Sequence, residues 1–331
     1  MNHSSNVTPT PNPLLDRSDI RVTHAAGMSG YIRKFIDQIK SGDLGSLPVV
    51  VGLILIWGIF TFINPIFLSP NNLVNLLFDS STVGIIALGI VCVLMLGEID
   101  LSVGSMSGVG SAILGVLWVN QGVPLGIAIG ISLCFGAMVG FAYASLRNSF
   151  GMPSFVSTLA GLLALLGLQL YLLGSTGSIN LPYGSSMVNF GQLMVMPDWV
   201  SYSLSVFAGG VIAFSEWTLR RKRKSANLSA KSAKFIWVKA LVVTALLLAV
   251  SAYLNQGRGI PWMFGLFIFL GVARNYALTS TKWVRYMQAV AGNAEAAPRA
   301  RINVEGLYLS HFVTYSPVAT VEGVIEEGRW G

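Results

Sequence analysis

Long apolar runs recur along the chain from residue 47 onward, and they lead to a prediction of its fold. Each run can cross the roughly 30 Å hydrocarbon core of a bilayer as a helix of about 20 residues. Only helices or closed barrels satisfy their backbone in lipid, and the alternation of barrel strands is absent from these runs. We therefore predict an all-α integral membrane protein, a polytopic bundle with about eight transmembrane helices at 47–64, 80–97, 103–119, 123–146, 154–173, 199–219, 235–254 and 260–279.

Polar segments divide the chain into four parts. The predicted parts are a cytoplasmic polar tail (1–46), a transmembrane core (47–279) with a basic cytoplasmic loop (220–234), a cytoplasmic segment (280–304) and an atypical tail (305–331). The first part has apolar residues at helical spacing around Phe35, which predicts either a short amphipathic helix on the inner leaflet or a solvated lead-in to the first span.

The last part resembles a further span that is interrupted. Proline and charged residues interrupt its apolar pattern at Pro317, Glu322, Glu326, Glu327 and Arg329. Several ionised groups in one helix cost more to insert than its few apolar residues recover. We therefore expect that this tail does not insert.

Composition and charge agree with the membrane class and give its orientation. The chain is 53% hydrophobic and only 11% charged, with a mean hydropathy of +0.66. Its net charge of +7 comes from short segments between the apolar runs and not from one soluble basic face, so no nucleic-acid partner is expected. With the N-terminus in the cytoplasm, Arg258 is the one Lys or Arg assigned to an outer connector, as the positive-inside rule requires.

Histidine and cysteine suggest no chemistry of their own. His3, His24 and His311 all lie outside the eight predicted spans, and no metal cluster or Ser/His/Asp set can be assembled around them. Cys92 and Cys134 lie within apolar runs without metal-ligand spacing, which indicates packed thiols. A membrane enzyme or receptor is therefore disfavoured, and we expect no metal and no cofactor.

One stretch, GEIDLSVGSMSG from Gly97 onward, places the carboxylates of Glu98 and Asp100 between two strongly apolar runs. A carboxylate near the bilayer centre costs about 2.5–3.5 kcal/mol on insertion scales. Carboxylates at this place in the sequence are therefore expected to have a structural or functional role. In one interpretation Asp100 or Ser102 caps the next helix while Gly97 and Gly104 relax the turn. In the other, a broken helix lines a transport route. Spacing alone favours the cap.

Small residues four apart predict close helix packing. The pairs are Gly104 with Gly108, Gly126 with Gly130, and Gly136 with Gly140.

Three blocks in the chain resemble a known family. They are EIDLSVGSMSG, then MPSFVSTLAGLLAL from Met152, and later RYMQAVAGNAEAAPRARINV from Arg285. In order and separation they resemble the permease subunits of bacterial ABC sugar importers of the ribose/xylose/arabinose class, most of all the xylose-transporting members. The resemblance spans about residues 45–315.

This resemblance implies a multi-pass protein of the bacterial inner membrane that works as a homodimer with a second permease copy. A periplasmic sugar-binding protein would deliver a pentose or similar monosaccharide, and a cytoplasmic ABC ATPase subunit would drive its import. The chain has no GxxxxGK[ST] phosphate loop, so we expect a transporter subunit that is not itself an enzyme. The sugar is not specified, and Gln169, Tyr171, Asn275 and Tyr276 are only candidates for contacting it.

The resemblance also assigns the ATPase-coupling segment. Its residues are Gly292, Asn293, Glu295, Ala296 and Ala297. Asn293 can cap a short helix there, and Glu295 then meets the positive end of the helix dipole.

The chain also departs from the family pattern. Family members continue past INV (302–304) with further spans and a second acidic, glycine-rich block that this chain lacks. The alternative is therefore a truncated, transport-incompetent permease fragment.

Overall fold

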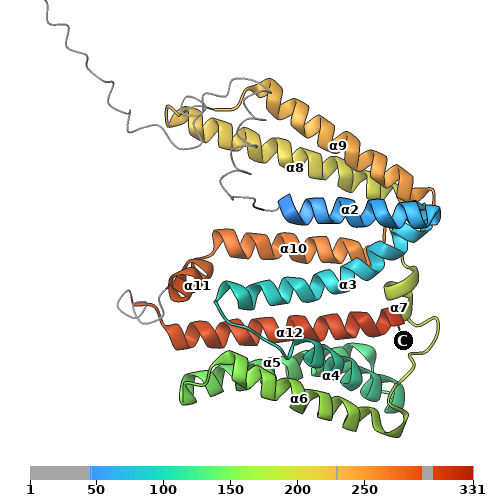
Figure 1. The fold of residues 1–331 in the computed structure, drawn as a ribbon, viewed down its shortest axis with the longest axis vertical. Coiled ribbons are helices and arrows are strands. Elements are labelled where there is room, and N and C mark those ends of the chain that lie inside the picture. The colour runs from blue at the N-terminus through green and yellow to red at the C-terminus, as the bar shows by residue number, and fades with distance from the viewer. Residues whose placement is uncertain (1–44, 46, 229, 293–300, 331) are drawn as a thin grey trace, which may run out of the picture. The chain divides into compact units, whose positions relative to one another are not determined.

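The computed structural model describes residues 45, 47–228, 230–292 and 301–330 of the 331-residue chain (Figure 1). In these ranges the regular structure is helical, apart from one isolated bridge between Val195 and Pro261. The α-helices are α2 (Leu47–Ile63), α3 (Pro70–Met95), α4 (Val103–Gly115), α5 (Leu125–Phe150), α6 (Ser154–Leu173), α7 (Ser186–Val188), α8 (Asp198–Ser225), α9 (Ala233–Asn255), α10 (Trp262–Ser280), α11 (Lys282–Gly292) and α12 (Val304–Trp330). Shorter 3-10 or π turns are η1 (Pro65–Leu68), η2 (Val116–Asn120), η3 (Gly174–Thr176) and η4 (Asn189–Leu193).

Every apolar run predicted as a span coincides with a helix, which confirms the all-α membrane fold. Within the described residues, six helices are long and apolar enough to cross a membrane: α3, α4 with its π turn, α5, α6 with its 3-10 turn, α9 and α10. The helix α2 is apolar but shorter, with 17 residues. The largest boundary error is at α3, which begins at Pro70 and not near residue 80.

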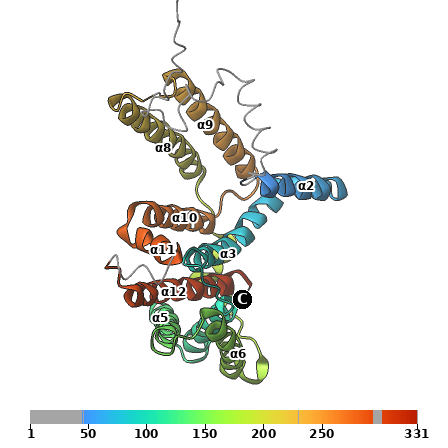
Figure 2. The same ribbon diagram turned by 60° about the vertical axis from the view of Figure 1, so that its left-hand side comes forward.

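The chain divides into two compact units. The first unit holds α2, α8 and α9. Here α8 and α9 lie side by side as an antiparallel pair (Figure 2), joined by a 2.8 Å hydrogen bond between the hydroxyls of Ser205 and Ser251. Gly209 allows this approach, because a Cβ there would lie 1.7 Å from the Thr244 hydroxyl.

The predicted basic loop is helical at both of its ends. In the structure α8 continues through Arg220 and Lys224 to Ser225, and a short connection then leads to α9 at Ala233. The expectation of a loop was therefore wrong for residues 220–225 and 233–234. Lys and Arg are good helix formers and are favourable at a helix C-terminus, where the dipole is negative.

The second unit contains α4–α7, α10–α12 and most of α3. In it α12 packs against α4 and α5, and both views show it between α3 and α5 (Figures 1 and 2). The core of this unit is formed by buried residues such as Met106, Tyr143, Met287 and Phe312. The predicted small-residue contact is confirmed at Gly136 and Gly140, where α12 lies directly against α5.

The segment after residue 304 is a continuous helix within this unit, and Pro317 does not interrupt it as the sequence suggested. This helix is not among the six candidate spans, and the expectation that the tail does not insert stays a prediction. Three of its charged residues have partners. The Oε2 atoms of Glu322 and Glu327 accept hydrogen bonds from the hydroxyls of Ser107 (2.5 Å) and Ser111 (2.7 Å) on α4. Arg329 donates to Asp79 on α3 at 2.8 Å. The sequence argument treated each charge as facing lipid alone, whereas neighbouring helices supply partners for Glu322, Glu327 and Arg329.

Candidate functional site

The GEIDLSVG stretch forms the turn between α3 and α4, which we call the signature turn. Gly97 ends the first of these helices. Gly97 has φ +78°, a conformation that favours glycine. Its N–H donates to the carbonyl of Leu94 at 3.0 Å, and the N–H of Glu98 donates to the carbonyl of Val93 at 3.2 Å. These two bonds define a Schellman motif, in which a glycine commonly ends the helix. Gly104 has open space around its Cβ position and makes no close helix contact.

Asp100 organises the rest of the turn. Its Oδ1 accepts hydrogen bonds from the backbone N–H and the hydroxyl of Ser102, both at 2.7 Å. Ser102 is the N-cap residue of α4, but its side chain makes no capping bond, and Asp100 bonds before the first helical turn. The predicted side-chain cap is thus replaced by an Asx turn. Burial raises the pKa of Asp100, and hydrogen bonding from Ser102 opposes this rise.

Glu98 connects the turn to three other helices. Its Oε1 lies 2.8 Å from Nη2 of Arg147 at the end of α5, and its Oε2 accepts a hydrogen bond from Ser154 at the start of α6. The Arg147 guanidinium lies over the ring of Tyr308 on α12, 3.7 Å from its centroid. Both members of the ion pair are largely buried, since the side chain of Glu98 is 13% exposed and that of Arg147 is 24% exposed. The pair therefore links helices inside the unit and is not a solvated surface pair.

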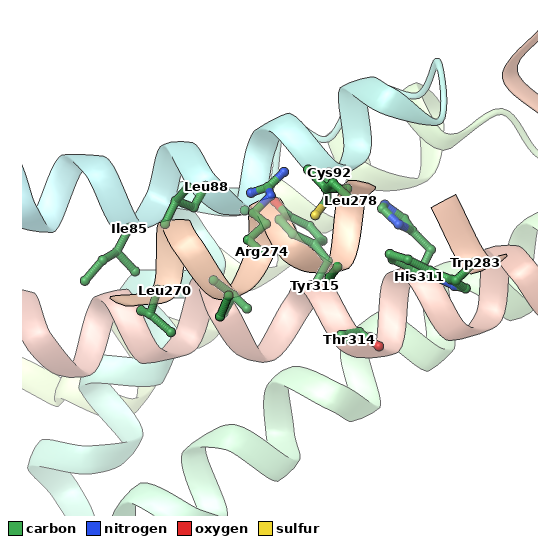
Figure 3. Close-up of a pocket in the computed structure, with 14 residues that line it drawn as sticks. Ile85, Leu88, Cys92, Leu270, Arg274, Leu278, Trp283, His311, Thr314 and Tyr315 are labelled. Atoms are coloured by element: carbon green, nitrogen blue, oxygen red, sulfur yellow. The ribbon is translucent and has the colours of Figure 1, made fainter. Parts of the chain in front are cut away.

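A cavity of about 290 Å³ lies in the same unit, between α3, α10, α11 and α12 (Figure 3). Most of its lining is apolar. The lining residues that carry polar, sulfur or aromatic groups include Cys92, Arg274, Trp283, His311 and Tyr315. Figure 3 shows Arg274, Cys92 and Tyr315 near its middle and His311 beside Trp283 at one end.

The turn and the cavity meet at Tyr315. Its ring lies against Gly89, where a Cβ would lie 2.9 Å from the ring, so α3 and α12 approach closely at this point. The hydroxyl of the same tyrosine faces the Asp100 carboxylate. Neither Glu98 nor Asp100 lines the cavity itself.

Other predicted positions are not brought together. Tyr171 and Tyr276 are 82% and 68% exposed, the Gln169 side chain packs against Gly108, and none of these lines the cavity. Gly292 is the last residue of α11, whereas Asn293, Glu295, Ala296 and Ala297 lie outside the described residues. No metal-binding group of His, Cys, Asp and Glu occurs in the part of the chain that the structure describes.

The sequence analysis missed Arg274 and His311. Arg274 was not singled out, although a cation six residues before the end of an apolar helix is itself a sign of a functional position. His311 was set aside because it lies outside the predicted spans, yet it is fully buried.

Comparisons with known proteins place the chain in a family. Residues 72–326 match the family model described as "Branched-chain amino acid transport system / permease component". The chain is 31% identical over 297 residues to the xylose transport system permease protein XylH of Escherichia coli K12, a match covering 88% of this chain and 74% of that protein. XylH of Haemophilus influenzae is 31% identical over 303 residues, covering 89% and 78% respectively. The probable ABC transporter permease protein YphD of E. coli K12 is 28% identical over 296 residues, covering 89% and 70%.

No solved structure matches the chain. The family match covers most of the chain and includes the signature turn, the cavity and nearly all of α12. Together with the six membrane-length helices, it indicates a multi-pass protein of the bacterial inner membrane. The chain therefore belongs to the family of ABC-transporter permease components that includes the xylose permeases of E. coli and H. influenzae.

Proposed function

We propose that this chain is the membrane-spanning subunit of an ABC importer for a pentose or similar monosaccharide, of the xylose type. The observation that carries this proposal is the 31% identity to the E. coli xylose permease over 88% of the chain. The family match over residues 72–326 includes the signature turn and the residues that line the cavity. It therefore goes well beyond a shared short motif.

The proposal includes three protein partners. A cytoplasmic ATPase subunit would hydrolyse ATP, because the chain has no phosphate loop of the GxxxxGK[ST] type. A periplasmic sugar-binding protein would deliver the substrate, and a second copy of the chain would complete the membrane-spanning part.

Uptake measurements test the proposal. Cells that lack their own pentose transporters would express the chain with its cognate ATPase and binding protein, and would be supplied with labelled xylose, ribose or arabinose. We expect saturable uptake of a pentose, with xylose taken up most efficiently, and no uptake when the ATPase carries an inactivating substitution. Absence of uptake of all three sugars would contradict the proposal, whereas uptake of ribose or arabinose alone would contradict only the xylose assignment.

A charge reversal tests the proposed ATPase-coupling segment. Glu295→Arg should weaken retention of the ATPase during purification, because a cation is unfavourable near the N-terminus of a short docking helix. Glu305→Arg is the matched control, since Glu305 is an exposed acidic residue in the first turn of α12. Equal retention in the parent and the Glu295→Arg variant would show that the docking assignment is wrong.

A further inference from the structure

The cavity beside α12 contains buried polar atoms that have no hydrogen-bond partner in the described part of the chain. His311 is fully buried, and neither of its ring nitrogens is bonded. The Nη2 atom of Arg274 is also buried and unbonded. More than about 90% of buried polar groups in proteins have a hydrogen-bond partner. Two buried side chains with unbonded atoms in one cavity therefore indicate that a bound molecule supplies their partners.

The unbonded polar atoms determine which chemical groups a ligand of this cavity needs. Arg274 offers only donors, whereas a neutral His311 offers one donor and one acceptor. The Thr314 hydroxyl donates to the carbonyl of Ser310 at 2.6 Å and can still accept a hydrogen bond. A ligand that bonds to all three must therefore carry both donors and acceptors, and a molecule with several hydroxyl groups meets this requirement.

The shape of the cavity adds a second constraint. Trp283 stacks on His311 with ring centroids 5.8 Å apart, and His311 stacks on Tyr315 at 6.3 Å. All three residues line the cavity, where an aromatic face can pack against the apolar face of a sugar ring, and we call this stack of rings the aromatic wall. A volume of about 290 Å³ is at the lower limit of small-molecule sites, which begin at roughly 300 Å³, so the space suits one small molecule.

We propose that this cavity is a monosaccharide-binding site, in which Arg274 and His311 bind the sugar hydroxyls and the wall of Trp283, His311 and Tyr315 covers its ring. The proposal rests on the proposed transport function, whose substrate class it shares. An anion would also satisfy Arg274. However, it would leave the aromatic wall unused and would not need the acceptor on His311.

Direct binding to the full-length chain in lipid nanodiscs tests this site. Labelled xylose would be titrated against the parent, Arg274→Gln, His311→Gln and the control Arg221→Gln, which changes an exposed arginine on α8. We expect each cavity variant to weaken binding about tenfold or more, the scale for losing one hydrogen bond to a charged or buried partner. The control should bind as the parent does. If parent-like uptake and parent-like binding persist in both cavity variants, the cavity assignment fails while the transport function stands. If the parent neither binds nor transports a sugar, the proposed function itself fails.

The native cysteines allow a second test that changes no cavity residue. Cys92 lines the cavity, whereas Cys134 is exposed elsewhere on α5 and serves as an internal control. Labelling by a small thiol reagent would be followed for each cysteine by peptide mass spectrometry. Bound xylose should slow labelling of Cys92 and leave Cys134 unchanged. Equal effects on both cysteines, or protection by inorganic phosphate and not by sugar, would overturn the monosaccharide assignment.

Discussion

The contact between α5 and α12 depends on the absence of a side chain at Gly140. A Cβ at this position would lie 2.3 Å from the backbone carbonyl oxygen of Phe312 and 2.6 Å from the Ser316 hydroxyl. The first distance is about 1 Å shorter than ordinary van der Waals contact, and a backbone atom cannot rotate away, so α12 would have to shift. Overpacking costs about 1–3 kcal/mol, with this rigid contact near the upper end, whereas alanine gains about 1 kcal/mol in helix propensity. We therefore expect Gly140→Ala to destabilise the chain by about 2 kcal/mol.

Gly130 on the same helix provides the matched control, because nothing lies within 4 Å of its Cβ position. Gly130→Ala should leave stability unchanged or raise it by up to about 1 kcal/mol. Thermal unfolding of the detergent-solubilised protein, followed by tryptophan fluorescence, measures both. Since 1 kcal/mol corresponds to about 2–4 °C for a unit of this size, Gly140→Ala should melt about 4–8 °C below the parent. Equal melting temperatures for the two variants would refute the close packing of α12 on α5.

Two further predictions concern polar contacts in the same unit, and the same melting assay checks both. Glu98→Gln should lower the melting temperature because Arg147, 2.8 Å away, loses its anionic partner. Adding Arg147→Gln to this variant should lower the melting temperature little further. If the losses of the two single variants add up in the double variant, the ion pair is excluded. Ser107→Ala should cost about 1–3 kcal/mol, because the buried Glu322 carboxyl loses the hydroxyl bonded to it at 2.5 Å. An unchanged melting temperature would show that this hydrogen bond does not hold α12 on α4.

Hydropathy predicted the helices well because lipid leaves the backbone few other ways to satisfy its hydrogen bonds. It predicted their ends less well. The start of α3 was placed late because its first turn is polar, although Ser69 before Pro70 is a start signal: the Ser69 hydroxyl accepts a hydrogen bond from the N–H of Asn72 at 3.4 Å. Glycine spacing identified a true contact at Gly136 and Gly140, but Gly126 and Gly130 have open space around them. Spacing alone does not say which face of a helix has a partner.

The candidate site was predictable only in part. The signature turn is local, so Gly97 and Asp100 could be assigned to it from neighbouring residues. The cavity is not local, because it forms where α3, α10, α11 and α12 come together from distant parts of the chain. Hydropathy also assigned the charged residues of α12 to an excluded tail, since a one-dimensional pattern cannot show the hydroxyls on α4 that satisfy them. His311 lies in the same segment and was therefore not considered as a site residue.

Asp100 is the residue through which the signature turn reaches the cavity. Its Oδ1 holds the turn by accepting two hydrogen bonds from Ser102, and its carboxylate also faces the hydroxyl of Tyr315. Asp100→Asn keeps an oxygen for the turn but removes the charge that faces this tyrosine. If the carboxylate positions Tyr315 in the cavity wall, we expect near-normal amounts of folded protein with reduced sugar uptake and weaker protection of Cys92 by sugar. Uptake per folded permease is the decisive measurement, because an unchanged value would mean that Asp100 stabilises only the turn between α3 and α4.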